Sequence, residues 1–315
     1  MLSHRMNFWS LTIKIMFLSQ TTAGILGNFS LLFCYIVHYG KHTLKPTDLI
    51  LMNLMAANAL IILSAGVPNT IAAFGLKQFL NDFKCRLILC IQRISRGGSI
   101  GTTCLLSVYQ AMTISPRESC CKVHNVKAVK CICCSIAVLW GFYMLINFIF
   151  LVYTFVKKNS KNVTRKQDFG YCFITGRDEI NDSLYAALVM CPEFFFSALM
   201  AYSSGSMIII LYRHKERVQH IRSTHGSIRN SPESTATQNI LTLVSTFLAF
   251  YTLSSVLRGC IAILYNHSWW LANITRFTSL CFPCFGPFVL INHYSIVPRL
   301  SSVWIRNKNH LIFFK

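Results

Sequence analysis

Seven long apolar stretches alternate along the chain with short segments that carry nearly all of its charge. The stretches cover residues 11–37, 49–74, 87–114, 131–156, 184–212, 240–264 and 274–296. A transmembrane helix needs roughly 20 mostly apolar residues to cross about 30 Å of hydrocarbon, and every stretch reaches that length. The sequence therefore predicts an all-α fold, a seven-transmembrane helix bundle that forms a single membrane domain over residues 1–315.

The composition agrees with a bilayer environment. Charged residues make up only 13% of the chain, against about 25% in an ordinary soluble domain. Soluble helices carry a charged face, whereas Phe142–Phe155 and Met207–Leu211 carry none. The net charge of +20 would suggest a nucleic-acid partner in a soluble protein. Here the Lys and Arg residues flank the spans, where they meet anionic lipid, so the predicted partner is the lipid bilayer and no nucleic acid.

An odd number of spans places the two termini on opposite sides of the membrane. With the N-terminus outside and the C-terminus inside, the inner segments carry fifteen Lys and Arg residues and the outer segments ten, as the positive-inside rule requires. The segment between spans four and five contains two formal glycosylation acceptors, Asn162 and Asn181, which are modified only on the lumenal side. The first apolar stretch has no small-residue cleavage site, so it is expected to remain as an anchor. These features predict a multi-pass protein of the plasma membrane.

Most of the fourteen cysteines lie within spans or on the predicted inner side, where thiols stay reduced. Cys85 at the outer mouth of span three and Cys172 in the long outer loop are placed differently. The oxidising exterior would let them form a disulfide, and the alternative is two unpaired thiols. Cys120 and Cys121 at the inner end of span three are either palmitoylation sites or small apolar residues.

Some landmarks of the rhodopsin-like G-protein-coupled receptors are present and others are missing. The landmarks present are Gly27-Asn28, Asn53-Leu54, Trp140 and Pro192. Asn58 stands where that family has a sodium-binding Asp. Span three lacks the acid-arginine-tyrosine triplet, span six lacks Cys-Trp-x-Pro, and span seven lacks Asn-Pro-x-x-Tyr.

A set of ordered blocks accounts for these departures. The blocks are 101–107 (GTTCLLS), 110–116 (QAMTISP), 213–220 (RHKERVQH), 231–238 (SPESTATQ), 243–247 (LVSTF) and 287–293 (PFVLINH). They resemble the vomeronasal type-1 receptors, and the resemblance covers essentially the whole chain. It implies a pheromone-type chemosensory receptor that binds a small organic, pheromone-like ligand and activates a heterotrimeric G protein of the inhibitory (Gi/Go) class.

Five ionisable residues lie within the predicted spans, where an unpaired charge costs several kcal/mol. They are Arg93, Arg96, Glu193, Arg258 and Arg276. A helical rise of about 1.5 Å per residue places all five in the outer half of the bundle. One interpretation is an outer ligand-binding pocket with excess positive charge, which suits a carboxylate or sulfate because Arg binds such groups bidentately. The expected apolar wall consists of Phe194, Phe195, Tyr251 and Phe277.

The alternative interpretation is an internal salt bridge between Glu193 and one arginine that holds helices together without touching ligand. This alternative is favoured for Arg96, because the resemblance implies that an arginine at this position of span three is shared within the family. Arg276 has a further alternative, since its side chain can extend to the membrane surface. For Glu193 and Arg258 both interpretations stay open.

The inner ends of spans three, five and six are expected to face the G protein. The residues predicted there are Ser115, Arg117, Arg213 and Arg217, and the alternative is that these basic segments only flank the membrane. The chain is not predicted to be an enzyme, because it carries no catalytic motif. No cofactor or metal is predicted, since Cys131, Cys133 and Cys134 are too crowded for a zinc site. A bitter-taste-type receptor and, less favoured for want of internal repeats, a membrane transporter are the competing functions.

Overall fold

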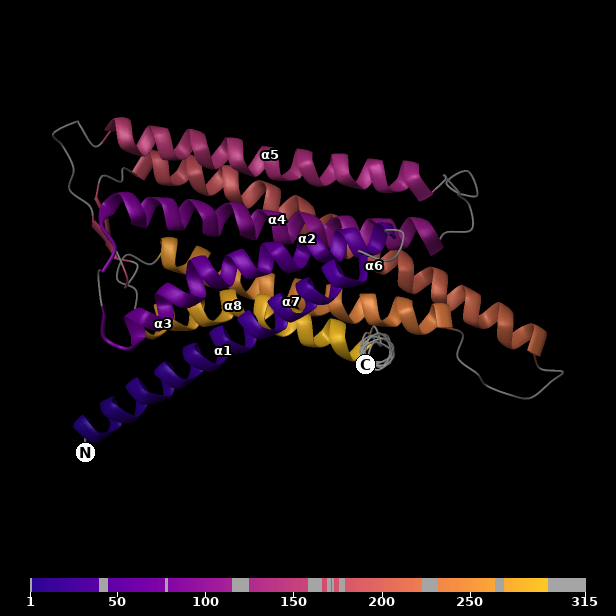
Figure 1. Cartoon of the computed structure of the whole chain (residues 1–315), viewed down its shortest axis with the longest axis horizontal. Coiled ribbons are helices and arrows are strands. Elements are labelled where there is room, and N and C mark those ends of the chain that lie inside the picture. The colour runs from indigo at the N-terminus through magenta and orange to yellow at the C-terminus, as the bar shows by residue number, and fades with distance from the viewer. Residues whose placement is uncertain are drawn as a thin grey trace, which may run out of the picture.

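The apolar stretches fold into long helices that run side by side (Figure 1). The computed structural model describes residues 2–39, 45–76, 79–114, 125–157, 166–168, 171, 173–175, 179–222, 232–263 and 269–293. The helices are α1 Leu2–Tyr39, α2 Pro46–Ile61, the π-helical segment η1 Ile62–Gly66, α3 Val67–Ala73, α4 Asp82–Ile114, α5 Asn125–Lys157, α6 Glu179–Arg222, α7 Pro232–Ile263 and α8 Trp269–His293. Since α2, η1 and α3 form one continuous helix, the described residues contain seven long helical segments.

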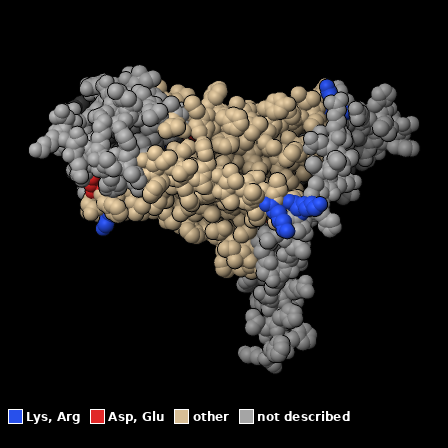
Figure 2. Space-filling view, turned by 90° about the horizontal axis from the view of Figure 1, so that it is seen from above, with Lys and Arg blue, Asp and Glu red and all other residues tan. Residues whose placement is uncertain are grey.

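Several helices are long and apolar enough to cross a membrane. By length and composition these are Ser10–Val37, Pro46–Ala73, Lys127–Ile149 and Cys191–Ile210, four within the described part of the chain. Figure 2, which views the molecule from the side of α5, shows a broad surface band without Lys, Arg, Asp or Glu, and blue Lys and Arg atoms near its ends. Large apolar side chains such as Phe33 and Val138 are two-thirds exposed. An apolar surface of this extent needs lipid or a partner to cover it.

The helices extend beyond the apolar stretches at several ends. α1 begins at Leu2 rather than near residue 11, and α6 runs from Glu179 to Arg222 rather than from 184 to 212. Backbone hydrogen bonding does not stop where the hydrocarbon stops, so polar turns continue the helix into the headgroup region. The all-α expectation also omitted a short antiparallel hairpin, β1 Lys166–Asp168 with β2 Phe173–Thr175. It lies in the loop between α5 and α6.

Two prolines interrupt α8, and α1 compensates for one of them. Pro287 has no N–H to donate to the carbonyl of Pro283 four residues earlier. The side-chain amide of Asn28 donates to that carbonyl over 2.8 Å. A Cβ on the neighbouring Gly27 would lie 3.0 Å from the Pro287 ring, so glycine allows the two helices to approach. The Gly27-Asn28 pair therefore joins α1 to the weakened turn of α8.

α4 is the central helix and packs against α2, α5, α6 and α7. Its contact with α5 is close because α4 presents glycines there. A Cβ on Gly97 would fall on the ring of Tyr143, and one on Gly98 would lie 2.9 Å from the Trp140 ring. Small residues at such contacts let the backbones approach, which is how helices associate in lipid.

Trp140 also closes a polar connection between three helices. Its indole N–H donates to the Asn53 side-chain oxygen over 3.1 Å, and the Asn53 amide donates to the Thr102 hydroxyl over 2.7 Å. The three residues come from α5, α2 and α4 respectively. Two of the landmarks seen in the sequence, Asn53 and Trp140, are therefore partners in one hydrogen-bonded chain.

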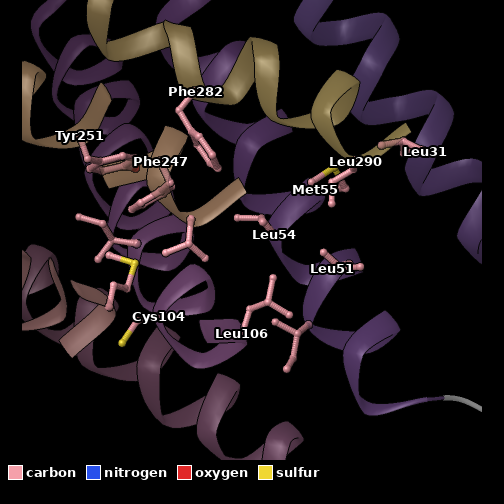
Figure 3. Close-up of a cluster of buried hydrophobic side chains, with 14 of the residues drawn as sticks. Leu31, Leu51, Leu54, Met55, Cys104, Leu106, Phe247, Tyr251, Phe282 and Leu290 are labelled. Atoms are coloured by element: carbon pink, nitrogen blue, oxygen red, sulfur yellow. The ribbon is translucent and has the colours of Figure 1, made fainter. Parts of the chain in front are cut away.

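The main apolar core fills the centre of the bundle (Figure 3). It draws on α1, α2, α4, α5, α6, α7 and α8. Within it, the ring of Phe247 stacks on Tyr251 with centroids 4.1 Å apart and meets the ring of Phe282 edge-on at 4.4 Å. These three rings connect α7 to α8.

Candidate functional site: a buried ion network between three helices

A buried ion pair joins α4 to α6. The Arg96 Nε atom lies 3.0 Å from Oε1 of Glu193, and the two side chains are only 9% and 8% exposed. Both charges are therefore largely withdrawn from solvent. Such a pair is stable only when further hydrogen bonds satisfy the remaining donors and acceptors.

Two adjacent serines on α7 supply those hydrogen bonds. The Arg96 Nη1 and Nη2 atoms donate to the hydroxyls of Ser254 and Ser255, each over 3.2 Å. The Ser255 hydroxyl in turn donates to Oε2 of Glu193 over 3.1 Å. The guanidinium of one helix, the carboxylate of a second and the hydroxyls of a third thus form a single ion network.

Arg258 lies at the margin of the ion network. Its Nη2 atom donates to the same Ser254 hydroxyl over 3.2 Å, and its Nε atom donates to the Ser254 carbonyl over 3.4 Å. No carboxylate pairs with this half-buried arginine within the part of the chain that the structure describes. The described network thus contains two guanidinium groups and one carboxylate, which pairs with Arg96 alone, so the network carries one excess positive charge.

Tyr251 connects the ion network to the apolar core. Its hydroxyl donates to the Arg96 carbonyl over 3.3 Å, and the Arg96 Cζ atom lies 4.3 Å from the centroid of its ring. An arginine over an aromatic face gains cation–π attraction. Because Tyr251 stacks on Phe247, a displacement of Arg96 would also shift the packing of these two rings, which are labelled in Figure 3.

Arg93 and Arg276 lie nearer the β1–β2 hairpin. Tyr171, between the two strands, is 3% exposed and packs with Cys85 and Leu89. Burial raises the pKa of Tyr171 to about 12, although the nearby positive charges of Arg276 and Arg93 act to lower it. The phenol is therefore uncharged at physiological pH. Both half-buried arginines are therefore close enough to act electrostatically on Tyr171.

The structure thus separates the five charged residues into two groups. Arg96, Glu193 and Arg258 share one network, and the ion pair is the one that the internal salt-bridge interpretation expects. The expected aromatic wall was wrong in part, because Phe194 and Phe195 are 77% and 61% exposed and face away from the bundle. Their depth was predictable, but a helix that is apolar all round gives no sign of which side faces inward.

The structure describes some of the other predicted site residues fully, some only in their backbone and some not at all. Cys85 is disulfide-bonded, and Arg213 is exposed on α6. Arg217 and Asn181 lie in α6, with only their backbone placement described. Ser115, Arg117, Asn162 and Cys172 lie outside the described residues. No group of three or more His, Cys, Asp or Glu side chains that could hold a metal ion occurs among the described residues.

Sequence reasoning missed the two serines of the ion network. A signal was present, because each serine lies three or four residues from both Tyr251 and Arg258, so the four residues fall on one side of the helix. Tyr143 was also missed. Its hydroxyl is buried and has no hydrogen-bond partner among the described residues, while its ring packs against Gly97, the residue after Arg96.

Comparison with known proteins identifies the family. The model of the vomeronasal organ pheromone receptor family matches residues 11–302. The chain belongs to this family. Human vomeronasal type-1 receptor 4 is 44% identical over 292 residues, which cover 92% of this chain and 97% of that receptor. Human vomeronasal type-1 receptor 2 is 44% identical over 92% of this chain and 73% of its own length. The zebrafish olfactory receptor class A-like protein 1 is 29% identical over 89% of each chain.

Membership of the family settles the broad class of function. The protein is a chemosensory membrane receptor of the G-protein-coupled type and not an enzyme. The blocks in spans three, five, six and seven therefore led to the correct family from the sequence alone. The bitter-taste and transporter alternatives are wrong.

Proposed function

We propose that this receptor crosses the plasma membrane seven times, with its N-terminus outside and its C-terminus in the cytosol. The excess of Lys and Arg in the segments assigned to the inner side supports this orientation. The β1–β2 end of the bundle is then extracellular. Disulfide pairing of Cys85 with Cys172 and glycosylation at Asn162 and Asn181 belong to the same proposal, because all four residues fall on that side.

The ligand of the receptor, in this proposal, is a small organic anion whose carboxylate or sulfate binds Arg258. The observation that carries the proposal is the excess positive charge of the ion network, where Arg258 has only Ser254 as its described partner. Glu193 already pairs with Arg96, so an anion at Arg258 adds a counter-charge without breaking the buried ion pair. Arg93 and Arg276 add positive potential on the path from the extracellular side.

Ser254 gives the ligand a way to influence the helices. Its hydroxyl accepts hydrogen bonds from both Arg96 and Arg258. When an anion draws Arg258 away, Arg96 becomes the sole described donor to that hydroxyl, and the contact between α4 and α7 changes. Ligand binding can shift a helix arrangement only through such a difference between two states.

The change in helix arrangement is transmitted to the opposite, cytosolic end of the bundle. There the receptor activates a heterotrimeric G protein of the Gi/Go class through Ser115, Arg117, Arg213 and Arg217. Two features support this assignment: Arg213 is exposed on α6, and α6 projects beyond its neighbours at the end away from the hairpin (Figure 1). Movement of helix ends on this side is the usual way such a bundle exposes a partner site.

Nucleotide exchange on purified Gi and Go tests the proposal directly. Membranes that contain the receptor should accelerate exchange when given matched carboxylated or sulfated odorants, and the neutral analogues should be weaker. Arg258→Gln should raise the half-maximal concentration of the anionic ligands by about 10- to 100-fold, because a hydrogen bond to a charged group contributes about 1.5–3 kcal/mol. The response to neutral analogues should change little.

Lys84→Gln is the matched control, because Lys84 is an exposed cation at the same end of the bundle and outside the ion network. It should leave all potencies unchanged. A response confined to neutral compounds would contradict the anionic ligand. Exchange on other G proteins but not on Gi or Go would contradict the coupling class.

A further inference from the structure

We propose that the cytosolic end of α5 is a fatty-acylation site, with Cys131 and Cys134 as the principal acceptors and Cys133 as a third. All three are free thiols with exposed side chains. In contrast, Ile132 between them is buried and faces the core. The proposal rests on the orientation given under Proposed function, which places this end of α5 beside the cytosol.

The three thiols lie at the depth where the hydrocarbon meets the lipid headgroups. The apolar part of α5 begins at Lys127, and both Lys127 and Lys130 are exposed. Cationic side chains hold that turn at the level of anionic headgroups. At about 1.5 Å per residue, Cys131 and Cys134 lie roughly 6 and 10 Å deeper than Lys127. Cysteines next to the membrane boundary are the ones that undergo S-palmitoylation.

The outer face of α5 has room for an acyl chain that starts at these thiols. Cys131, Cys134, Val138, Gly141 and Leu145 follow one another at spacings of three and four residues, so they form one stripe along the helix. Every residue of the stripe is exposed. A Cβ at Gly141 would meet nothing within 4 Å. An acyl chain attached to Cys134 would therefore run along an open apolar surface and not enter the bundle.

The reaction needs only an acyl-coenzyme A as co-substrate. The cysteine thiolate attacks the thioester carbonyl, a new thioester forms on the receptor, and coenzyme A leaves as a thiol after taking up the proton. No electron transfer is involved. Other thiols of the chain are poor acceptors, since Cys104, Cys281 and Cys284 are buried and Cys191, although exposed, begins the apolar part of α6 at its extracellular end.

Thioester exchange on the full-length receptor in cells tests the site. After free thiols are blocked, hydroxylamine should release thiols that accept a polymer-tagged maleimide and retard the receptor on a gel. In a background with Cys120→Ser and Cys121→Ser, we expect this shift to persist. It should disappear when Cys131, Cys133 and Cys134 are also changed to serine, whereas Cys191→Ser, an exposed thiol on the other side, should leave it intact.

Mass spectrometry of the hydroxylamine-released thiols in the unmodified receptor provides a second measurement that does not depend on the folding of a variant. Absence of the shift, or its persistence in the triple variant, would overturn the proposal. Labelling of intact cells with a membrane-impermeant maleimide separates this failure from failure of the orientation. Labelling of Cys131 or Cys134 from outside would overturn both proposals, whereas protected but unacylated thiols would overturn acylation alone.

Discussion

Arg96→Gln should remove most of the receptor from the cell surface. The change leaves the carboxylate of Glu193 buried on α6 with only the Ser255 hydroxyl as a described donor in the ion network. Breaking a buried ion pair by removing one partner costs about 3–5 kcal/mol, a large part of the total stability of a typical domain, about 5–15 kcal/mol. Surface immunostaining of intact cells, together with thermal unfolding in detergent, measures the loss.

The double variant Arg96→Gln/Glu193→Gln is the decisive comparison. With both charges removed, two neutral amides and the hydroxyls of Ser254 and Ser255 can hydrogen-bond with one another, and much of the surface expression should return. A coupling of this kind identifies a direct interaction. Arg258→Gln is the matched single variant, because its half-buried guanidinium pairs with no carboxylate in the described structure, and its expression should be close to normal. Arg96→Gln with normal expression and an altered ligand response would instead make Arg96 a ligand contact.

Gly97→Ala should have the second-largest effect, through the contact between α4 and α5. The added methyl group would occupy the position of the Tyr143 ring, which is itself buried. Overpacking of a filled interior costs about 1–3 kcal/mol. Here the displaced ring also lies next to the ion network, whose charges act on the Tyr143 hydroxyl. We expect a lower unfolding temperature in detergent and reduced surface expression.

Gly205→Ala on α6 is the matched control. A Cβ at Gly205 would meet nothing within 4 Å, and alanine favours a helix over glycine by up to about 1 kcal/mol. This variant should be as stable as the parent or slightly more stable. Equal destabilisation by the two substitutions would show that the loss at Gly97 comes from the backbone and not from the Tyr143 contact.

The structural roles of the landmark residues found in the sequence are evident only from the packing of the helices. Gly27-Asn28 is recognisable in the chain, but its role depends on Pro283 and Pro287, more than 250 positions later. Asn53 and Trp140 were noted separately, yet they are bonded to each other. A pattern of residues along the chain carries no distance between helices, so such pairs cannot be derived from it.

The membership of the candidate site was predictable, and the resemblance favoured Arg96 for the salt bridge, but the spacing of residues along the chain alone could not pair the charges. The residues Arg96, Glu193 and Arg258 were singled out because a charge in a bilayer is costly, and each was placed in the outer half by counting turns. Which arginine meets Glu193 depends on how the helices are rotated about their axes. Helices without a polar face, such as α6, give no sign of that rotation, so Phe194 and Phe195 were expected on the wrong side.

The membrane environment and the receptor family were readable from the chain, because insertion into lipid depends on a local sum of side-chain transfer free energies and the family blocks are contiguous. The serine partners of the ion pair and the excess charge at Arg258 emerged only from the packed helices. Close approach at Gly97 and Gly98 brings α4 against α5, and the resulting helix positions decide which buried charges are neutralised.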